Sequence, residues 1–418
     1  MRTAICERLG IEFPLFAFSH CRDVVAAVTN AGGFGVLGAI AYSPEQLDTE
    51  LTWIDERVGG RPYGVDVLVP GKIDASALDA NVRLADAVPE RHRDFVAHLF
   101  AKYGLTGSSP GAPLGSGPVP GPAAGLGPLE EPVAPGSVGP GSVGPGSVGP
   151  GSVGGRGGAA DEVGRRVTPA GATGLIDVAL KHPIGLIASA LGPPPPEMAA
   201  KAREAGVPVA ALVGTVEHAR RQVAAGADII VAQGTEAGGH TGDISTMVLV
   251  PQVVDAVAPV PVLAAGGIAS GRQMAAALAL GAEGVWCGSV WLTTEEAETA
   301  PAVKRKMLAA SSLDTVRSRS RTGKPARQLR SAWTEEWDSA QESPGPLGMP
   351  LQLLMAEEAM TRIGAAAERG EPGAVELANY FVGQVVGQLD QVKPAREVVY
   401  EMVSEFADAV ERLRRLSG

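Results

Sequence analysis

A histidine in a glycine-rich segment has the clearest chemistry in this sequence. His240 lies in AQGTEAGGHTG, residues 232–242, directly after an apolar run typical of a strand. Histidine has an ordinary pKa of ~6.5, so it can act as a general base at neutral pH. His20 follows another predicted strand and could line the same face. The other histidines lie in helical or charged surroundings and are expected to be structural or solvated: His92, His98, His182 and His218.

Two glycine turns predict a phosphate-binding site. One is Gly266-Gly267, which follows an apolar run and precedes Ser270, a residue suited to cap the next helix. The other is Gly288-Ser289, which follows a later apolar run. Glycine lets backbone N–H groups approach phosphate oxygens, and a helix N-terminus adds a favourable dipole. Both turns follow the last two predicted strands, where barrel enzymes often bind phosphate.

Other suggestive residues have simpler explanations. The pattern G-x-G-x-x-G at 33–38 follows a helical segment and occupies a strand, so we expect no dinucleotide-binding loop there. Cys287 in the last strand is expected to be a core residue rather than a nucleophile. No Cys/His spacing resembles a metal site. The basic run 317–330 is expected to be a solvated loop; a rim that attracts anionic substrates or a nicotinamide phosphate is the alternative.

The elements that must position these residues alternate between strand and helix. Helices are expected at 43–58, 193–205 and 215–225, each with start or stop signals. Eight strand–helix units with nearly continuous apolar strands predict an α/β fold, a (β/α)8 TIM barrel. The eight strand candidates are 13–18, 33–38, 63–69, 184–191, 207–213, 227–234, 260–267 and 284–289.

One stretch interrupts the alternation. Residues 104–165 are rich in Gly, Pro, Ser and Val and contain PGSVG four times in succession. Such a segment cannot bury enough apolar area to offset its backbone entropy. We therefore expect a flexible insertion after the third unit, with a tethered lid or a partner-binding segment as the alternative.

The expected domains follow from that insertion. Residues 1–103 and 166–330 form the two parts of the barrel, and 331–418 form a helical region that packs on it. An apolar stripe over 398–413 predicts a terminal helix against the barrel, with a homodimer contact as the alternative.

Composition excludes several classes of protein. The 418-residue chain is 45% hydrophobic, enough for a sizeable core, and its formal net charge of −11 argues against a general nucleic-acid binder. Three cysteines do not make a disulfide framework and fit a reducing compartment. No run approaches the ~18 apolar residues of a membrane span, and no secretory signal is recognisable. A cytoplasmic protein is expected.

Several blocks together resemble the nitronate monooxygenase family, also called 2-nitropropane dioxygenases. They are 30–38 (NAGGFGVLG), 232–242, 262–289 and 322–330 (TGKPARQLR). The resemblance implies a TIM barrel that binds FMN non-covalently, with its phosphate on the seventh and eighth loops and His240 as the catalytic base. It implies these cofactor-binding residues: Ala17, Asp66, Gln233, Gly234, Gly238, Gly239, Gly266, Gly267, Gly288 and Ser289.

Two departures concern the flavin ring and the substrate. The loop after the first strand usually resembles Gln-Gly-Gly-Met in the family, whereas this chain has 17–21, AFSHC. The third strand often presents asparagine, whereas this chain has Asp66. The resemblance therefore specifies the cofactor better than the substrate.

The function implied by the resemblance is oxidation of alkyl nitronates or nitroalkanes with O2 to carbonyl compounds and nitrite. His240 would remove the carbon-bound proton of a neutral nitroalkane, a step that a preformed nitronate does not need. Enoyl-ACP reductases and NAD(P)H:quinone reductases share the same blocks, so an NAD(P)H-dependent flavin reductase is an alternative. A flavin-binding protein with little turnover is another. The expected partners are a small-molecule substrate, O2 and, for a reductase, NAD(P)H, with no nucleic acid or membrane.

Overall fold

The computed structural model describes residues 1–68, 87–105, 169–190 and 192–417. The chain divides into two units, one made of Met1–Thr106 and Gly158–Gly418, the other of Gly107–Gly157. The second unit, and with it most of the predicted insertion at 104–165, lies outside the described residues. The domain boundaries stay predictions.

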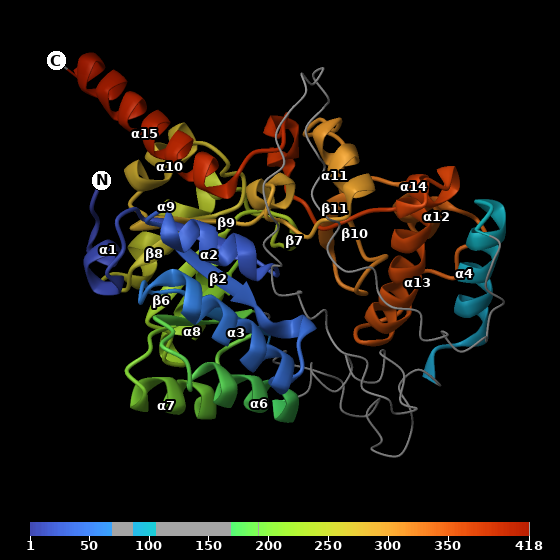
Figure 1. Ribbon diagram of the computed structural model, residues 1–418, viewed down its shortest axis with the longest axis horizontal. Coiled ribbons are helices and arrows are strands. Elements are labelled where there is room, and N and C mark those ends of the chain that lie inside the picture. The colour runs from blue at the N-terminus through green and yellow to red at the C-terminus, as the bar shows by residue number, and fades with distance from the viewer. Residues whose placement is uncertain (69–86, 106–168, 191, 418) are drawn as a thin grey trace, which may run out of the picture. The chain divides into compact units, whose positions relative to one another are not determined.

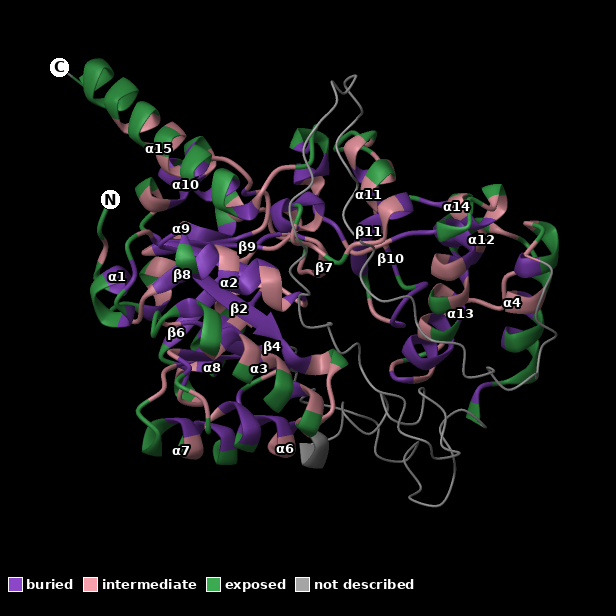
Figure 2. Ribbon diagram, in the orientation of Figure 1, coloured by how far each residue is buried: buried purple, intermediate pink, exposed green. Residues whose placement is uncertain are grey.

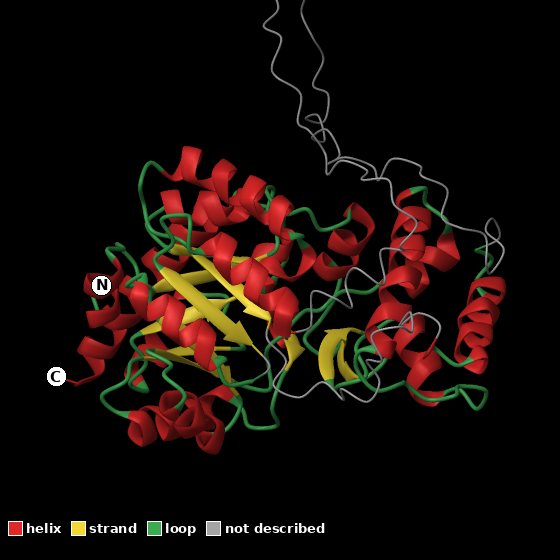
Figure 3. Ribbon diagram, turned by 90° about the horizontal axis from the view of Figure 1, so that it is seen from below, coloured by secondary structure: helices red, strands yellow, loops and turns green. Residues whose placement is uncertain are grey.

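Eight parallel strands form a closed barrel in the order β1-β2-β3-β4-β5-β6-β8-β9 (Figure 3). Each of the eight predicted apolar runs overlaps one of them, so the TIM barrel is confirmed. The strands are β1 (Leu15–Ser19), β2 (Phe34–Gly38), β3 (Gly64–Leu68), β4 (Leu186–Ala190), β5 (Val209–Val213), β6 (Ile229–Gln233), β8 (Val262–Ala265) and β9 (Gly284–Cys287).

Helices cover the outside of the barrel. Side-chain caps begin three of them where expected: Ser43 forms a capping box at α3, and Thr215 and Ser270 accept from the backbone at the starts of α8 and α10. Such caps satisfy N–H groups that have no partner inside the helix. The helices of this part are α1 (Ala4–Leu9), α2 (Arg22–Asn30), η1 (Ala39–Ala41), α3 (Pro44–Val58), α6 (Pro169–Ala179), α7 (Pro196–Glu204), α8 (Val216–Ala224), α9 (Thr246–Val257) and α10 (Gly271–Ala279).

The barrel strands are buried on both faces (Figure 2). Alternate residues point inward and form a core of their own, which includes Phe16, Phe34 and Trp286. The residues between them pack outward against the helices, as expected of a parallel sheet that helices enclose.

A second, three-stranded antiparallel sheet carries the predicted base. Its order is β10 (Thr315–Ser318), β11 (Ala326–Leu329), β7 (Gly239–His240), and Ala326 is the register partner of His240. A two-residue strand after β6 is thereby tied to a segment more than 80 residues later. The remaining elements are η4 (Ser289–Thr293), α11 (Pro301–Leu308), α12 (Ala332–Ser339), α13 (Leu351–Glu368), α14 (Pro372–Leu377), η5 (Gln384–Gln388) and α15 (Ala395–Ser417).

A helix between the third and fourth barrel strands packs with the C-terminal helices. It is α4 (Glu90–Lys102), which lies beside α12 and α13 in Figure 1. Its Phe95 meets Trp337 of α12 edge-on at 4.8 Å, and Lys102 pairs with Glu336 of α12 at 2.6 Å. This association was not predicted.

The terminal helix α15 packs on α10, as its apolar stripe predicts. Val399 and Met402 are buried, and a Cβ on Gly271 of α10 would lie 2.0 Å from the Met402 carbonyl oxygen. The end of the helix extends away from the barrel, and Leu413 is 49% exposed (Figure 1). The homodimer contact stays a prediction. In the described part of the chain, no helix is long and apolar enough to cross a membrane.

Candidate active site

His240 lies at the edge of the second sheet, half-buried, with one close hydrogen-bond partner. Its Nε2 is 2.8 Å from the Thr322 hydroxyl oxygen, and its ring lies 6.5 Å from that of Phe381. Burial, and to a smaller extent the positive charge of Lys324, lowers the pKa of His240 to about 4. The imidazole is therefore neutral at physiological pH, which is the form a general base needs.

Thr322 decides which imidazole nitrogen carries the lone pair. Its hydroxyl oxygen is also 3.1 Å from the Lys324 carbonyl oxygen, which can only accept a hydrogen bond. When the hydroxyl donates to that carbonyl, His240 Nε2–H donates to Thr322 and Nδ1 is the basic nitrogen. When it donates to His240 instead, Nδ1 carries the proton. Thr322 therefore holds the ring in place, and the direction in which its hydroxyl donates sets the tautomer.

The loop between β6 and β7 is fixed by contacts that leave no room for side chains. A Cβ on Gly234 would lie 2.1 Å from the Thr246 hydroxyl oxygen. The Glu236 carboxylate accepts from the Thr246 backbone N–H at 3.0 Å and thereby caps α9. The Thr246 hydroxyl also lies 2.9 Å from the Gly266 carbonyl oxygen. The glycine-rich loop and the turn after β8 are thus joined through Thr246.

The two predicted glycine turns offer free backbone donors. Gly266 and Gly267 have φ of 91° and 70°, a left-handed conformation that favours glycine. The backbone N–H groups of Gly267 and Gly288 have no hydrogen-bond partner among the residues that the structure describes. At the start of α10, by contrast, the Gly271 N–H already donates to Glu405 at 2.8 Å. An anion here would be held by the turns rather than by the first N–H of that helix.

A segment of the C-terminal region closes on both loops. The Gly383 N–H donates to the Ser289 hydroxyl at 2.8 Å, and a Cβ on Gly383 would lie 2.6 Å from the Glu236 carbonyl oxygen. Gly238 meets the same segment from the other side, because its Cβ would lie 2.9 Å from the Gly383 nitrogen. Sequence reasoning missed Gly383 and Phe381, whose positions depend on long-range packing.

Part of the basic run is built into the fold. Arg321 is buried, donates to Asn379 at 2.9 Å, pairs with Glu357 at 2.8 Å and lies over the Phe381 ring. Arg327 is also buried and donates to the Thr235 carbonyl at 2.9 Å. The prediction of a solvated loop is wrong for these two arginines, because each has internal acceptors.

The interior of the barrel mouth combines aromatic and polar side chains. Phe18 and Trp286 stack at 6.4 Å between ring centres. The alternation of β3 and β6 directs Asp66 and Gln233 to the same interior face. Ala17 does not share it, since its side chain packs in the outer core between strands and helices.

His20 follows the last residue of β1 and lies beside that face. Its Nδ1 is 3.1 Å from the Gly38 carbonyl oxygen, and burial lowers its pKa. The ring approaches so closely that a Cβ on Gly38 would lie 2.5 Å from it. The prediction that His20 lines the catalytic face stays open, because no ligand contact is described.

Two simpler interpretations hold. Residues Phe34–Gly38 form strand β2, so the G-x-G-x-x-G pattern is no dinucleotide loop. Gly35 serves packing, since its Cβ would lie 2.4 Å from the Val25 carbonyl oxygen of α2. Cys287 is a core residue, and burial raises the pKa of its thiol to about 12.

One group of side chains in the described part has spacing that could suit a metal: Cys21, Asp23 and Glu298. The Cys21 thiol donates to the Glu296 carbonyl at 3.0 Å, and burial raises its pKa to about 11. A metal would require the thiolate, which this environment disfavours.

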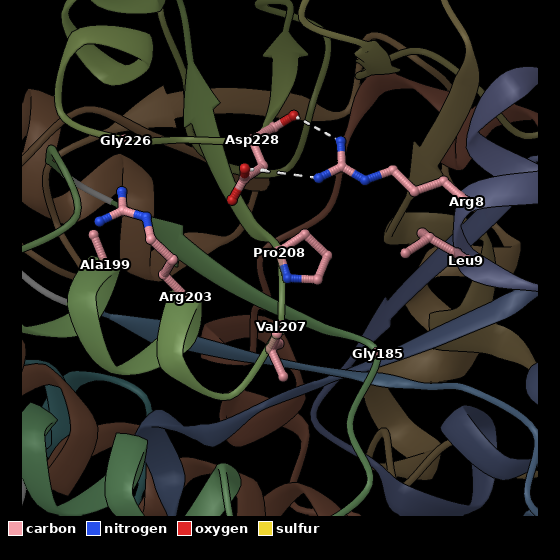
Figure 4. Close-up of a pocket in the computed structure, with 10 residues that line it drawn as sticks. Arg8, Leu9, Gly185, Ala199, Arg203, Val207, Pro208, Gly226 and Asp228 are labelled. Atoms are coloured by element: carbon pink, nitrogen blue, oxygen red, sulfur yellow. Dashed lines mark hydrogen bonds and ion pairs between the residues drawn. The ribbon is translucent and has the colours of Figure 1, made fainter.

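Two hollows lie outside the barrel mouth. One, of about 440 Å³, opens where β4, β5 and β6 begin, and Arg8, Arg203 and Asp228 line it (Figure 4). Arg8 and Asp228 pair across it and connect α1 to β6. The other, of about 480 Å³, is lined by Arg317 and Arg319 among others, so the anion-attracting rim stays a prediction.

Comparisons with known proteins find similar chains among proteins named as monooxygenases and a nitroalkane oxidase. A protein of Mycobacterium tuberculosis (strain ATCC 25618 / H37Rv) named "Putative monooxygenase Rv1533" is 56% identical over 421 residues, covering 100% of this chain and 99% of the relative. A Staphylococcus aureus (strain MSSA476) protein named "Probable nitronate monooxygenase" is 26% identical and covers 97% of each chain. A nitroalkane oxidase structure from Streptomyces ansochromogenes superposes with a TM-score of 0.70 at 25% identity, covering 98% of this chain and 100% of that one.

The model of the nitronate monooxygenase family matches residues 159–405, more than half of the chain. That range contains His240, both glycine turns and the segment around Gly383. The chain therefore belongs to the nitronate monooxygenase family and is an oxidoreductase with a TIM-barrel fold.

Proposed function

We propose that this protein is an FMN-dependent nitronate monooxygenase, which oxidises alkyl nitronates or nitroalkanes with O2 to carbonyl compounds and nitrite. The observation that carries the proposal is a neutral, half-buried His240 held by Thr322 at the end of the glycine-rich loop after β6, together with free N–H donors in the turns after β8 and β9. Family membership supports the reaction class.

The residues present fit FMN. Phosphate oxygens need N–H donors, and the turns at Gly266-Gly267 and Gly288-Ser289 offer two without a partner in the described part of the chain, those of Gly267 and Gly288. An isoalloxazine ring needs a largely apolar wall, which Phe18 and Trp286 provide inside the barrel. We assign these residues to the cofactor site, with Ala17 contributing through its backbone: Ala17, Asp66, Gln233, Gly234, Gly238, Gly239, Gly266, Gly267, Gly288 and Ser289.

The bound flavin supplies the redox chemistry, and the chain supplies a base and its orientation. The neutral imidazole of His240 takes the carbon-bound proton of a nitroalkane. The resulting imidazolium is disfavoured by burial and by Lys324, so the proton transfer needs compensation. The negative charge that develops on the substrate provides it, because opposite charges attract strongly in a poorly solvated site. Thr322 keeps the ring aimed throughout.

The decisive variant is His240→Asn, which keeps the size and polarity but removes the base. Turnover of neutral nitroethane should fall roughly 10²–10⁴-fold, the usual contribution of a positioned acid–base group. Turnover of preformed ethylnitronate should fall far less, and FMN content should not change. His218→Asn, at an exposed position on α8, is the matched control.

Each failure has a distinct meaning. Equal losses on both substrates would make His240 a binding residue. A purified chain that stays colourless after incubation with FMN would contradict the cofactor. Stopped-flow reduction of bound flavin by NAD(P)H but not by nitronate would replace the monooxygenase with a reductase.

A further inference from the structure

A row of three adjacent positions runs from His20, directly after β1, through Gly38 of β2 to Asp66 of β3. The strand register pairs Gly38 with Asp66 and Asp66 with Ala188 of β4. The β1–β2 register, extended by one residue, places His20 opposite Gly38, and the 2.5 Å approach of its ring to a Cβ at Gly38 agrees. The imidazole therefore occupies the space that a side chain at position 38 would fill, and position 38 is the register partner of Asp66.

Asp66 points into the barrel. Its neighbours Val65 and Val67 pack outward against α3 and α6, whereas its register partner Ala188 belongs to the interior core. The carboxyl is buried, and its surroundings on that face are mainly apolar, including Phe18, Val36 and Trp286. It is the third of the five residues of β3 and lies level with Gly38, the last residue of β2, toward the end of the barrel where TIM-barrel enzymes carry their chemistry.

No charge balances this carboxyl within the described residues. Burial alone raises the pKa of Asp66 to about 7, and neither neighbouring strand position, Gly38 or Ala188, is titratable. The elements that pack on β3 besides β2 and β4 are η1 and α6, and neither contributes a charge to that shift. His20 is the titratable group on the same row, and burial lowers its pKa.

His20 adds an acceptor to the same row. Its Nδ1 lies 3.1 Å from the Gly38 carbonyl oxygen, and since that oxygen can only accept, Nδ1 carries the hydrogen. Nε2 of the neutral ring then carries the lone pair and can accept a hydrogen bond. The row thus presents one carboxylic acid, that of Asp66, and one hydrogen-bond acceptor, Nε2 of His20. Neither carries a positive charge that would balance an anion.

We propose that Asp66 selects the charge of the ligand that this barrel mouth admits. As a carboxylic acid it donates a hydrogen bond to a ligand oxygen, and as a carboxylate it repels anions. This inference rests on the proposed function and narrows it: the preferred substrate is the neutral nitroalkane, whose proton His240 removes, rather than the preformed nitronate anion.

The test is anion binding to the flavin-loaded full chain, read from the perturbation of the flavin absorbance. Nitrate is the probe, because it resembles a nitronate and keeps one charge at all relevant pH values. Its Kd for the wild type should rise about 30-fold between about pH 6 and pH 8.5, as a carboxyl that titrates near 7 ionises. Asp66→Asn should remove that rise and bind nitrate about 30-fold more tightly at the higher pH.

Controls separate this proposal from the proposed function. Asp177→Asn on α6, where the carboxylate pairs with Lys201 outside the barrel, should keep the wild-type slope. Asp66→Ser covers the case in which the asparagine variant does not fold. Because nitrate binding needs no turnover, inactivity toward nitroalkanes would refute the proposed function without affecting this measurement. The same pH slope in wild type and both Asp66 variants, or no nitrate binding to any of them, would overturn the role of Asp66.

Discussion

Substituting His240 should change how the stability of the protein depends on pH. Burial holds the pKa of this histidine at about 4 in the folded state, against 6.5 in the unfolded chain. Below pH 6.5 the unfolded state therefore binds the proton more readily than the folded state. By linkage, the free energy of unfolding contributed by His240 is constant above pH 6.5 and falls as the pH drops toward 4.

The magnitude follows from these two values. Between about pH 7.5 and about pH 5, nearly all unfolded chains gain a proton at His240, whereas most folded chains do not. The linkage relation gives a loss of about 2 kcal/mol for the wild type over this interval. The variant His240→Asn has no group at this position that gains a proton over this interval, so it should not show this loss. It should be less stable than wild type near pH 7.5 by about 1 kcal/mol, because it weakens the contact with Thr322, and more stable near pH 5.

Urea unfolding of the full chain near pH 7.5 and near pH 5 measures the free energy of unfolding of each variant, with matched flavin content in each sample. The difference between variant and wild type is the quantity to follow, because other groups titrate in the same range. Asp66 acts in the opposite sense, since its raised pKa stabilises the fold as the pH falls from 7. His218→Asn should follow the wild type. If wild type and His240→Asn lose equal stability between the two pH values, burial does not penalise the imidazolium, and the reasoning fails.

Three further outcomes are expected. Replacing 107–157 by a short linker should leave flavin content and melting temperature nearly unchanged, because the cost of loop closure varies slowly with length; an insoluble product would contradict this. Arg321→Ala should lower the free energy of unfolding by about 2–3 kcal/mol, because it leaves Asn379 and Glu357 without their partner. Arg321→Lys should recover part of this loss. A loss for Arg321→Ala below the error of urea titrations would refute the stabilising role of these contacts. If α15 forms a dimer contact, two antiparallel copies would place the acidic first half of one helix against the arginine-rich end of the other. The double variant Leu413→Glu, Leu416→Glu should then reduce the mass measured by light scattering to that of a monomer. An unchanged mass excludes the contact.

The barrel was predictable because its signals are local. Each strand is a short apolar run, and the serine and threonine caps of α3, α8 and α10 lie within three residues of the groups they satisfy. The position of His240 after β6 follows from the same pattern. Such features depend on a few neighbouring residues, so one sequence contains them in full.

The setting of the base depends on contacts between distant segments. Thr322 reaches His240 because β11 pairs with β7, and nothing in two residues of strand predicts that partner. The block 322–330 was noted in the sequence only for its resemblance to the family, and that resemblance did not predict its contact with His240. Arg321 looked solvated for a related reason: its acceptors, Asn379 and Glu357, come from elements that appear later in the chain.

Glycines show why the same letters need different explanations. Gly35 and Gly267 both lie in glycine-rich blocks, yet Gly35 has no positive φ and is constrained by the backbone of α2, which a Cβ would meet at 2.4 Å. Gly267 has φ of 70° and a free N–H, so glycine is needed there for the left-handed conformation that exposes this donor. The first use brings a helix against a strand, and the second suits an anion. A pattern such as G-x-G-x-x-G therefore carries function only where the backbone turns and exposes its donors, which in this chain happens after β8 and β9 and not in β2.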